Sequence, residues 1–230
     1  MTVILDHLLT GSLAPLGPRA VPSGIDKQPV AGPCRLTVTG LAGDAQGDPR
    51  YHGGPDKAVH HYPFQHYAAW IADLGPLPRL ERPGAFGENL STSGLDEATV
   101  AVGDVFRLGS ALIEVSQGRQ PCWKLNIRFG VADMARRVQQ TGRTGWYYRV
   151  LEEGTVAAGD TLTLLDRRTP DWPLARLWRI LYVDVLNRDE LRAMAAQPRL
   201  PEGWRQYAEK RLAAGQVEDW RSRLNGERGA

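Results

Sequence analysis

Short runs of apolar and β-branched residues, separated by glycine, proline, aspartate and serine, fill the first 166 residues of the chain. Such runs are typical of short strands, and many of them in succession favour a β-barrel or a sandwich. The strands predicted in this way are Leu36–Thr39, Ala58–Tyr62, Val100–Val102, Ala111–Val115, Trp146–Val150 and Thr161–Leu165. We therefore predict a mainly β fold for this part of the chain.

Two helices are predicted to interrupt the strands. They are centred on Phe64–Asp73 and Val131–Gln140. Arg136 and Arg137 fall in the last turns of the second helix, and Gly142 follows it, as glycine commonly does at the carboxyl end of a helix.

The hydrophobic period changes to that of helices after Asp166–Pro170. Leu174, Trp178, Leu181 and Val185 fall on one helical stripe. We therefore place a boundary here, with a β-rich domain in residues 1–168 and a small all-α domain in residues 169–230.

Further helices are expected in this tail. Asp189 can cap a second helix, Pro201 can open a third, and a short fourth segment runs from Val217 to Leu224. One face of the third helix would carry Trp204, Ala208 and Leu212. Four of the seven tryptophans lie in the tail, and we favour a packing role for them over a docking surface.

Composition and charge narrow the class of protein. The 230 residues carry 28 Lys and Arg against 26 Asp and Glu, and the resulting net charge of +2 argues against nucleic acid or an anionic membrane as a partner.

Asp6 interrupts the first apolar run, and no run approaches the roughly 18 apolar residues that span a membrane. We expect a cytoplasmic protein in which Cys34 and Cys122 remain thiols.

Cys122 is the first candidate for chemistry. It follows the predicted strand Ala111–Val115, in the loop Ser116–Lys124. Arg119 and Lys124 flank the thiol, and nearby positive charge favours the thiolate that attacks electrophiles or binds soft metals. A lone cysteine is also often a small buried apolar residue, and these residues alone leave the two interpretations level.

A glycine loop is the second candidate. Within Tyr51–Lys57, the amides of Gly53 and Gly54 can approach an anion closely, with His52 and Lys57 on either side. The spacing is not that of a P-loop, and a plain turn between strands is the alternative.

A second polar loop, Gly87–Asn89, brings an amide to the candidate set. Asn89 either donates to a ligand or closes an Asx-turn.

Several well-defined site types are not supported by the sequence. It has no Cys-x-x-Cys, no His-Glu-x-x-His, no acidic EF-hand loop and no Gly-x-Gly-x-x-Gly fingerprint. Structural zinc, zincin chemistry, a calcium loop and a resident nicotinamide are therefore not indicated.

The order of several short motifs resembles the MOSC family, domains related to the carboxy-terminal part of molybdenum-cofactor sulfurase. The motifs are Gly24–Lys27, Gly40–Asp44, His52–Lys57, Gly87–Leu90, Val102–Asp104, Ser116–Cys122, Thr141–Trp146 and Gly159–Asp160. The tail from about Trp172 is similar to the three-helix extension of the YiiM-like bacterial subgroup, which is named for resistance to 6-N-hydroxylaminopurine. The resemblance covers nearly the whole chain.

The resemblance implies a MOSC-type β-barrel with a few peripheral helices that binds a molybdopterin-type molybdenum cofactor. Cys122 would be the thiolate ligand to the metal and, with His52, a catalytic residue. The residues at the cofactor would be Gly53, Gly54, Lys57, Asn89, Arg119 and Cys122. A soft thiolate suits molybdenum, and basic, amide-rich loops suit the phosphate and pterin of the cofactor.

The activity implied by the resemblance is reduction of N-hydroxylated compounds, such as hydroxylaminopurine-type base analogues and amidoximes, with cleavage of the N–O bond. Because no flavin or nicotinamide motif is present, a separate reductase would supply the electrons. Two alternatives remain open at this point. Cys122 could carry sulfur as a persulfide, or the chain could be a cofactor-binding module without turnover.

Overall fold

The computed structural model describes residues 1–226 of the chain. Within this part, the strands form a nine-stranded sheet, a three-stranded sheet and a two-stranded hairpin. The strands are β1 (Thr2–Ile4), β2 (His7–Thr10), β3 (Ala14–Leu16), β4 (Val21–Ser23), β5 (Gln28–Pro29), β6 (Cys34–Thr37), β7 (Gly40–Leu41), β8 (Val59–Pro63), β9 (Leu90–Thr92), β10 (Asp104–Leu108), β11 (Ala111–Gly118), β12 (Trp146–Glu152), β13 (Gly154–Val156) and β14 (Thr161–Arg167).

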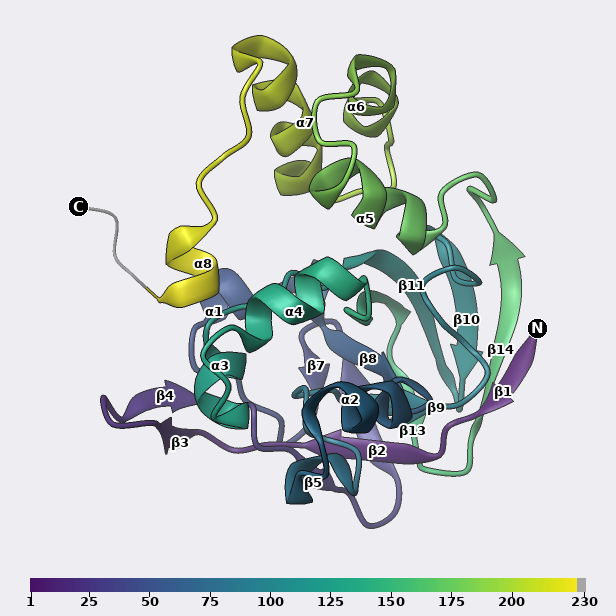
Figure 1. Ribbon diagram of the computed structural model, residues 1–230. Helices are drawn as coiled ribbons and strands as arrows, with labels where there is room; N and C mark the ends of the chain where they lie inside the picture. Colours follow the sequence, from purple (N-terminus) through teal and green to yellow (C-terminus); the bar gives the residue numbers. More distant parts are fainter. Residues whose placement is uncertain (227–230) are drawn as a thin grey trace.

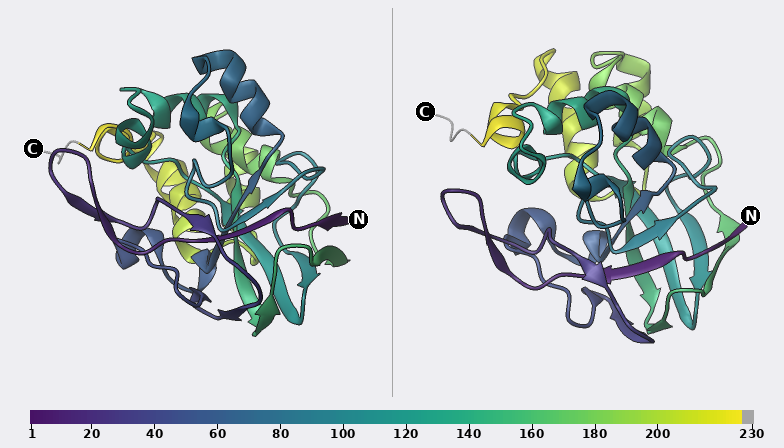
Figure 2. Two further views of the ribbon diagram at one scale, coloured as in Figure 1. Left: turned by 90° about the horizontal axis from the view of Figure 1, so that it is seen from below. Right: turned by 60° about the horizontal axis from the view of Figure 1, so that its bottom comes forward.

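Helices lie outside the sheets and gather on one side of the molecule (Figures 1 and 2). The helices are α1 (Pro49–His52), α2 (His66–Leu74), α3 (Lys124–Phe129), α4 (Met134–Thr141), α5 (Leu174–Tyr182), α6 (Arg188–Ala195), α7 (Glu202–Ala214) and α8 (Arg221–Asn225). Short 3-10 turns occur at Pro55–Lys57 and Pro78–Leu80.

The large sheet is open, so the prediction of a closed β-barrel was wrong. Its strand order is β1-β14-β10-β11-β12-β8-β9-β2-β5, with β8 and β9 parallel. The amino-terminal segment pairs with two strands that lie far apart in this order: β1 pairs with β14, and β2 pairs with β9. Leu5 still exchanges hydrogen bonds with the 159–160 turn, but the chain changes partner after Asp6. The two edge strands of this sheet, β1 and β5, do not pair with each other, so the sheet curls without closing (Figure 1).

The predicted strands are confirmed with shifted ends, with one exception. Residues 100–102 form no strand, and Ala101 makes only an isolated bridge to Pro173. The segment is nevertheless buried, with Val100 and Val102 fully inaccessible, which explains its strand-like apolar pattern. β11, in contrast, continues three residues beyond the predicted end at Val115.

The two predicted helices of the β-rich part are also confirmed. They are α2 and α4, and α4 ends at Gly142 in the left-handed conformation with φ of 73°. Both pack over the smaller of two core clusters, where Tyr62, Trp70 and Phe86 meet.

The helical tail is present, but two local predictions in it were wrong. α5 ends before Val185, so its buried stripe is Leu174, Leu177 and Leu181. The cap of α6 is Asn187 and not Asp189, because the Asn187 side chain accepts hydrogen bonds from the backbone of residues 189 and 190. Pro201 immediately precedes α7, as predicted.

The tail and the sheet share one core. Trp172, Leu177 and Trp204 belong to the same buried cluster as Val115 and Trp146 of the sheet. This agrees with a packing role for Trp172 and Trp204. The division at residue 168, as a statement about independent domains, stays a prediction.

The last helix returns to the β-rich part. α8 lies beside α3 and α4 (Figure 1), where Trp123 N donates to Arg223 O at 2.8 Å and Asn126 Nδ2 donates to Leu224 O at 2.8 Å. The carboxyl end of the described chain therefore packs close to the loop that carries Cys122.

Candidate active site

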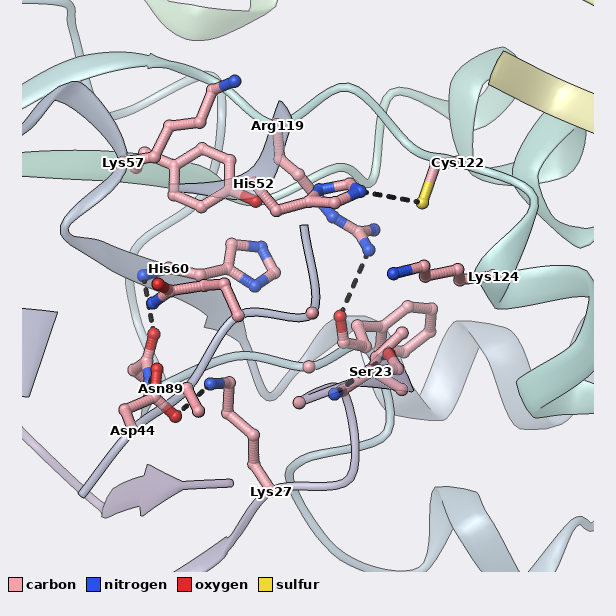
Figure 3. Close-up of a pocket in the computed structure, with 18 residues that line it drawn as sticks. Ser23, Lys27, Asp44, His52, Lys57, His60, Asn89, Arg119, Cys122 and Lys124 are labelled. Atoms are coloured by element: carbon pink, nitrogen blue, oxygen red, sulfur yellow. Dashed lines mark hydrogen bonds and ion pairs between the residues drawn. The ribbon is translucent and has the colours of Figure 1, made fainter. Parts of the chain in front are cut away.

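A cavity of about 570 Å³ opens between β8, the loops after β4 and β7, and the Gly118–Lys124 loop. We call it the thiol cavity, because Cys122 lies in its wall (Figure 3). Four Lys and Arg side chains line it against a single carboxylate, that of Asp44. The four cations are Lys27, Lys57, Arg119 and Lys124. The charge of this lining suits an anionic ligand.

Cys122 and His52 come together from distant parts of the chain. Cys122 lies between the end of β11 and the start of α3, whereas His52 is the last residue of α1. Cys122 Sγ lies 3.8 Å from His52 Nε2. Cys122 is buried, with 8% of its surface exposed.

The thiol of Cys122 is acidic for a buried cysteine. Burial by itself raises its pKa, but the hydrogen bond and charge of His52, together with the charge of Arg119, lower the pKa to about 7. About half of the thiol is therefore ionised at neutral pH. The thiolate is the nucleophilic and metal-binding form. His52 contributes more to the lowered pKa than Arg119 does, and Lys124 contributes through its backbone hydrogen bond.

Arg119 has a hydrogen-bonding group with no partner in the described part of the chain. Its Nη2 donates to Phe86 O at 3.2 Å, whereas Nη1 is buried and makes no hydrogen bond. An unpaired buried guanidinium nitrogen destabilises the fold unless a ligand accepts from it. Lys124, also buried, donates to Pro22 O at 3.1 Å and points into the cavity (Figure 3).

Asp44 organises the opposite wall. Lys27 and Asp44 form a buried ion pair, and Asn89 Nδ2 donates to Asp44 Oδ2 at 3.0 Å. Burial lowers the pKa of Lys27, and the attraction of Asp44 opposes this shift. Asn89 Oδ1 also accepts a hydrogen bond from the backbone N–H of His60 at 3.1 Å. The Asn89 side chain therefore bridges protein groups and does not form an Asx-turn.

The close packing of this wall requires glycine at one position. A Cβ added to Gly24 would lie 1.8 Å from the carbonyl oxygen of Ala45. Any side chain would thus separate the two loops that enclose the cavity.

His60 is the neutral member of the site. It lies on β8, its Nε2 is buried with no hydrogen-bond partner in residues 1–226, and burial holds its pKa well below the ordinary value. Its neighbour His61 faces the core, where Tyr148 Oη and Thr92 Oγ1 contact its two nitrogens and burial lowers its pKa to about 3.

The structure brings most of the predicted site residues together. The five that line the thiol cavity are His52, Lys57, Asn89, Arg119 and Cys122. Gly53 and Gly54 do not line it; they line a second cavity on the other side of the same loop. Gly54 has a φ of +96°, which favours glycine, whereas Gly53 has an extended φ of −120°. Their role at the cofactor stays a prediction.

Sequence reasoning gave no role to Lys27, Asp44, His60 and Tyr147, which also line the thiol cavity. Lys27 is the last residue of the motif Gly24–Lys27, and Asp44 is the last residue of Gly40–Asp44. Their place in motifs that carry the family resemblance was the sequence signal that could have identified them as site residues. His60 and Tyr147 lie on buried strands and look there like ordinary core residues.

The residues fit a cofactor better than a bare metal ion. Among the residues that the structure describes, no group of three or more His, Cys, Asp or Glu side chains is arranged to hold a metal. A metal in this cavity would have Cys122 as its protein ligand and would need other ligands of its own. The unpartnered Arg119 Nη1 and the neighbouring lysines provide donors for an anionic group, so the site fits a phosphate-bearing, metal-holding cofactor.

No helix within residues 1–226 combines the length and the apolar character needed to cross a membrane. This finding agrees with the absence of a long apolar run in the sequence.

Comparisons with known proteins find relatives that match most of the chain. Protein YiiM of Escherichia coli K12 is 41% identical over 210 residues, which cover 91% of this chain and 93% of that protein. A protein of Gibberella moniliformis named a reductase is 41% identical over 162 residues, or 70% of this chain but only 29% of that protein. The crystal structure of YiiM from Geobacillus stearothermophilus matches with a TM-score of 0.78 at 34% identity, covering 91% of this chain and 99% of that one.

Two family profiles divide the chain between them. Residues 48–163 match the MOSC domain, and residues 172–215 match the YiiM-like, 3-alpha helix domain. The first match contains Cys122, His52 and Arg119, and the second contains α5, α6 and α7. The chain therefore belongs to the MOSC-domain family, in the YiiM-like group that carries a 3-alpha helix domain.

Proposed function

We propose that this protein is a molybdenum-cofactor-dependent reductase of N-hydroxylated compounds, including hydroxylaminopurine-type bases and amidoximes. The substrate R–NHOH takes up two electrons and two protons, its N–O bond breaks, and the products are R–NH₂ and water. A separate reductase supplies the electrons.

The observation that carries this proposal is the acidic thiol of Cys122 beside His52 in a cavity lined with cations. A thiolate is a soft ligand suited to molybdenum. When bound, the cofactor supplies a metal centre that exchanges two electrons with the substrate. The family supports a MOSC-type function, and one relative is named a reductase.

The residues of the chain would bind the metal and the anionic part of the cofactor and would supply a proton. Sγ of Cys122 would bind the metal, and Arg119 Nη1 and Lys124 would bind the anionic part of the cofactor. His52 would keep a proton on Nε2, next to the thiolate, in a position to protonate the departing hydroxyl as water. Neutral His60 would offer its unpartnered Nε2 as a hydrogen-bonding group to the cofactor or substrate.

Elemental analysis tests the cofactor assignment. Molybdenum should co-purify with the full-length protein, and Cys122→Ser should lose it because a hydroxyl is a harder and far less acidic ligand. Cys34→Ser is the matched control. Cys34 is buried on β6, in the three-stranded sheet, and does not line the thiol cavity. Equal molybdenum in wild type and Cys122→Ser would refute the ligand assignment.

Turnover tests the reaction. The loaded protein, supplied with electrons by a chemical reductant, should convert 6-N-hydroxylaminopurine to adenine and benzamidoxime to benzamidine, whereas Cys122→Ser should not. Cyanide-labile sulfur on Cys122 without turnover would favour the sulfur-carrier alternative. Bound molybdenum with neither turnover nor labile sulfur would favour the non-enzymatic binding module.

A further inference from the structure

The loop that carries Cys122 is held by the last helix of the described chain. α8 lies beside α3, the helix that follows this loop (Figures 1 and 3). It begins at residue 221, whereas the two family profiles match residues 48–163 and 172–215. Neither profile therefore covers α8, although α8 contacts the residues on both sides of Cys122.

Arg223 makes both of these contacts. Its Nη1 donates to Pro121 O at 2.6 Å, and its own carbonyl oxygen accepts from Trp123 N at 2.8 Å. Pro121 and Trp123 are the residues immediately before and after Cys122. One residue of α8 thus fixes the backbone on both sides of the thiol.

The guanidinium of Arg223 is itself fixed by a second acceptor. Its Nη2 donates to Gln139 Oε1 on α4 at 2.6 Å, and Gln139 is only 5% exposed. The planar guanidinium therefore binds Pro121 and Gln139 through two separate nitrogens. A lysine, with one nitrogen, cannot reproduce this geometry.

Two further contacts join α8 to the same part of the chain. Asn126 Nδ2 donates to Leu224 O at 2.8 Å. Gly226 lies against the ring of Trp123, where an added Cβ would be 2.9 Å from Cγ, and its φ of +72° favours glycine. The fit between α8 and the loop therefore extends over several residues and does not depend on one hydrogen bond.

The position of this loop determines two interactions of the thiol. Cys122 Sγ lies 3.8 Å from His52 Nε2, and the backbone of Lys124 forms a hydrogen bond with the same sulfur. Both interactions lower the pKa of Cys122, whereas burial raises it. The contact with His52 is already long, so a small movement of the loop would break it.

We propose that Arg223 is a positioning residue for Cys122: it fixes the loop on both sides of the thiol and so keeps Sγ in contact with His52. No described residue after Tyr147 lines the thiol cavity, so the helical tail acts on the site through this loop. The inference rests on the proposed function only for the metal, because the contact between thiol and imidazole belongs to the protein itself.

Alkylation of Cys122 by iodoacetamide tests the inference without turnover. Full-length protein prepared without cofactor leaves the thiol free to react, and its rate should reach half the maximum near pH 7. In Arg223→Met the midpoint should move to about pH 8, towards that of His52→Gln, because the released loop lets the thiol leave the imidazole. Mass spectrometry of the labelled peptide measures the rate at each pH.

Gln139→Met separates positioning from charge. Arg223→Met removes a positive charge as well as two hydrogen bonds, and the lost charge alone would raise the midpoint. Gln139→Met keeps the charge and removes only the acceptor of Nη2, so it should raise the midpoint by about half as much. Arg223→Lys, which also keeps the charge, should have an intermediate midpoint. Wild-type midpoints in both charge-conserving variants would show that charge alone acts and would overturn the inference.

Two controls exclude indirect effects. Arg221→Gln changes an exposed arginine of the same helix, which pairs with Asp219 at 2.7 Å, and should keep the wild-type midpoint. Arg167→Met leaves the buried carboxylate of Asp104 without its ion pair, and neither residue lines the thiol cavity. This variant should unfold at lower urea concentration and still keep the wild-type alkylation midpoint.

Molybdenum content separates this inference from the proposed function. Purified from cells that make the cofactor, Arg223→Met should retain about threefold to tenfold less molybdenum than wild type, and Arg221→Gln the wild-type amount. A raised midpoint in Arg223→Met, with no molybdenum even in wild type, would refute the proposed function and keep the positioning role. A wild-type midpoint in Arg223→Met, or a shift no larger than that of Arg167→Met, would overturn the inference.

Discussion

His52 Nε2 lies 3.8 Å from Cys122 Sγ, although the two residues are 70 positions apart in the sequence. The contact joins the end of α1 to the loop before α3, and no local pattern relates these two segments. Its chemical result is an acidic thiol, because the hydrogen bond and the charge of His52 help to lower the pKa of Cys122 to about 7 although burial raises it.

The first prediction concerns the reactivity of the two thiols. The rate of alkylation of Cys122 by iodoacetamide should rise with pH and reach half its maximum near pH 7, because the thiolate is the reacting form and its pKa is about 7. Burial raises the pKa of Cys34, so that thiol should react much more slowly at neutral pH. Mass spectrometry of the labelled peptides measures both rates.

Removing His52 should change this profile. His52→Gln should move the midpoint of Cys122 alkylation upwards, because burial then raises the pKa with less opposition, and should slow labelling at pH 7 about tenfold or more. Cys34→Ser should leave the profile unchanged. An unaltered midpoint in His52→Gln would show that the two side chains do not interact in solution.

The second prediction concerns Arg119. Arg119→Lys should reduce the molybdenum and phosphorus retained through purification, because a lysine cannot place a donor both at Phe86 O and at the position of the unpartnered Nη1. A charge-assisted hydrogen bond contributes about 1.5–3 kcal/mol, so the loss of affinity should be about tenfold to a hundredfold. Arg107→Lys, at an exposed ion pair with Glu152, should retain the wild-type content.

The third prediction concerns the buried pair of Lys27 and Asp44. Asp44→Asn should lower the free energy of unfolding by about 3–5 kcal/mol, because it leaves a buried ammonium without its counter-charge. The double variant Lys27→Met with Asp44→Asn should recover much of this loss. Urea unfolding of the two single variants and the double variant measures the coupling, and strictly additive losses would contradict it.

The fourth prediction concerns Arg211, which is only 1% exposed on α7. Its guanidinium pairs with Glu218 at 2.7 Å and donates to carbonyl oxygens at the end of α5, including Ile180 and Leu181. Arg211→Met should cost about 3–5 kcal/mol of stability, since it leaves buried carbonyls and a carboxylate unpaired. Arg192→Met, at an exposed surface pair, should have no measurable effect on the urea midpoint.

The same pair should make stability depend on acid pH. Burial by itself raises the pKa of Glu218, but the hydrogen bonds from Arg211 and Trp220 outweigh burial and hold the pKa below its ordinary value. The ionised carboxylate therefore stabilises the fold fully above the pKa of the unfolded chain, and this contribution is lost as the pH falls through the lower folded pKa. Glu218→Gln should remove part of the acid dependence of the urea midpoint between about pH 5 and pH 3.

The fifth prediction concerns the contact between the tail and the β-rich part. Trp178 Nε1 donates to Gln139 O on α4 at 2.6 Å, and the Trp178 side chain is half-buried. Trp178→Phe keeps an aromatic ring but loses this hydrogen bond, so it should lower the unfolding free energy by about 1 kcal/mol. A loss as large as that of a fully buried aromatic, about 3–5 kcal/mol, would show that packing dominates at this position.

Local sequence patterns determined the main elements of this protein. The apolar alternation placed β8, β11, β12 and β14, and the change of period placed the helical tail, because both signals depend only on neighbours along the chain. Cys122 was a candidate for the same reason: its flanking charges lie within three residues of it. The residue that caps α6 and the residue at which α5 ends were not predicted correctly. Where a helix begins or ends depends on which of several neighbouring residues makes the terminal hydrogen bonds, and the apolar pattern does not contain this information.

Tertiary structure decided the closure of the sheet and the membership of the site. β1 and β2 are separated by two residues, yet they pair with strands far apart in the sheet, and the edge strands β1 and β5 do not pair with each other. Lys27 and Asp44 meet through the packing of two loops, and Gly53 and Gly54 face a different cavity from His52 although they follow it directly. Contacts of this kind depend on long-range strand register and on which way a loop turns, and hydrophobic periodicity encodes neither of them.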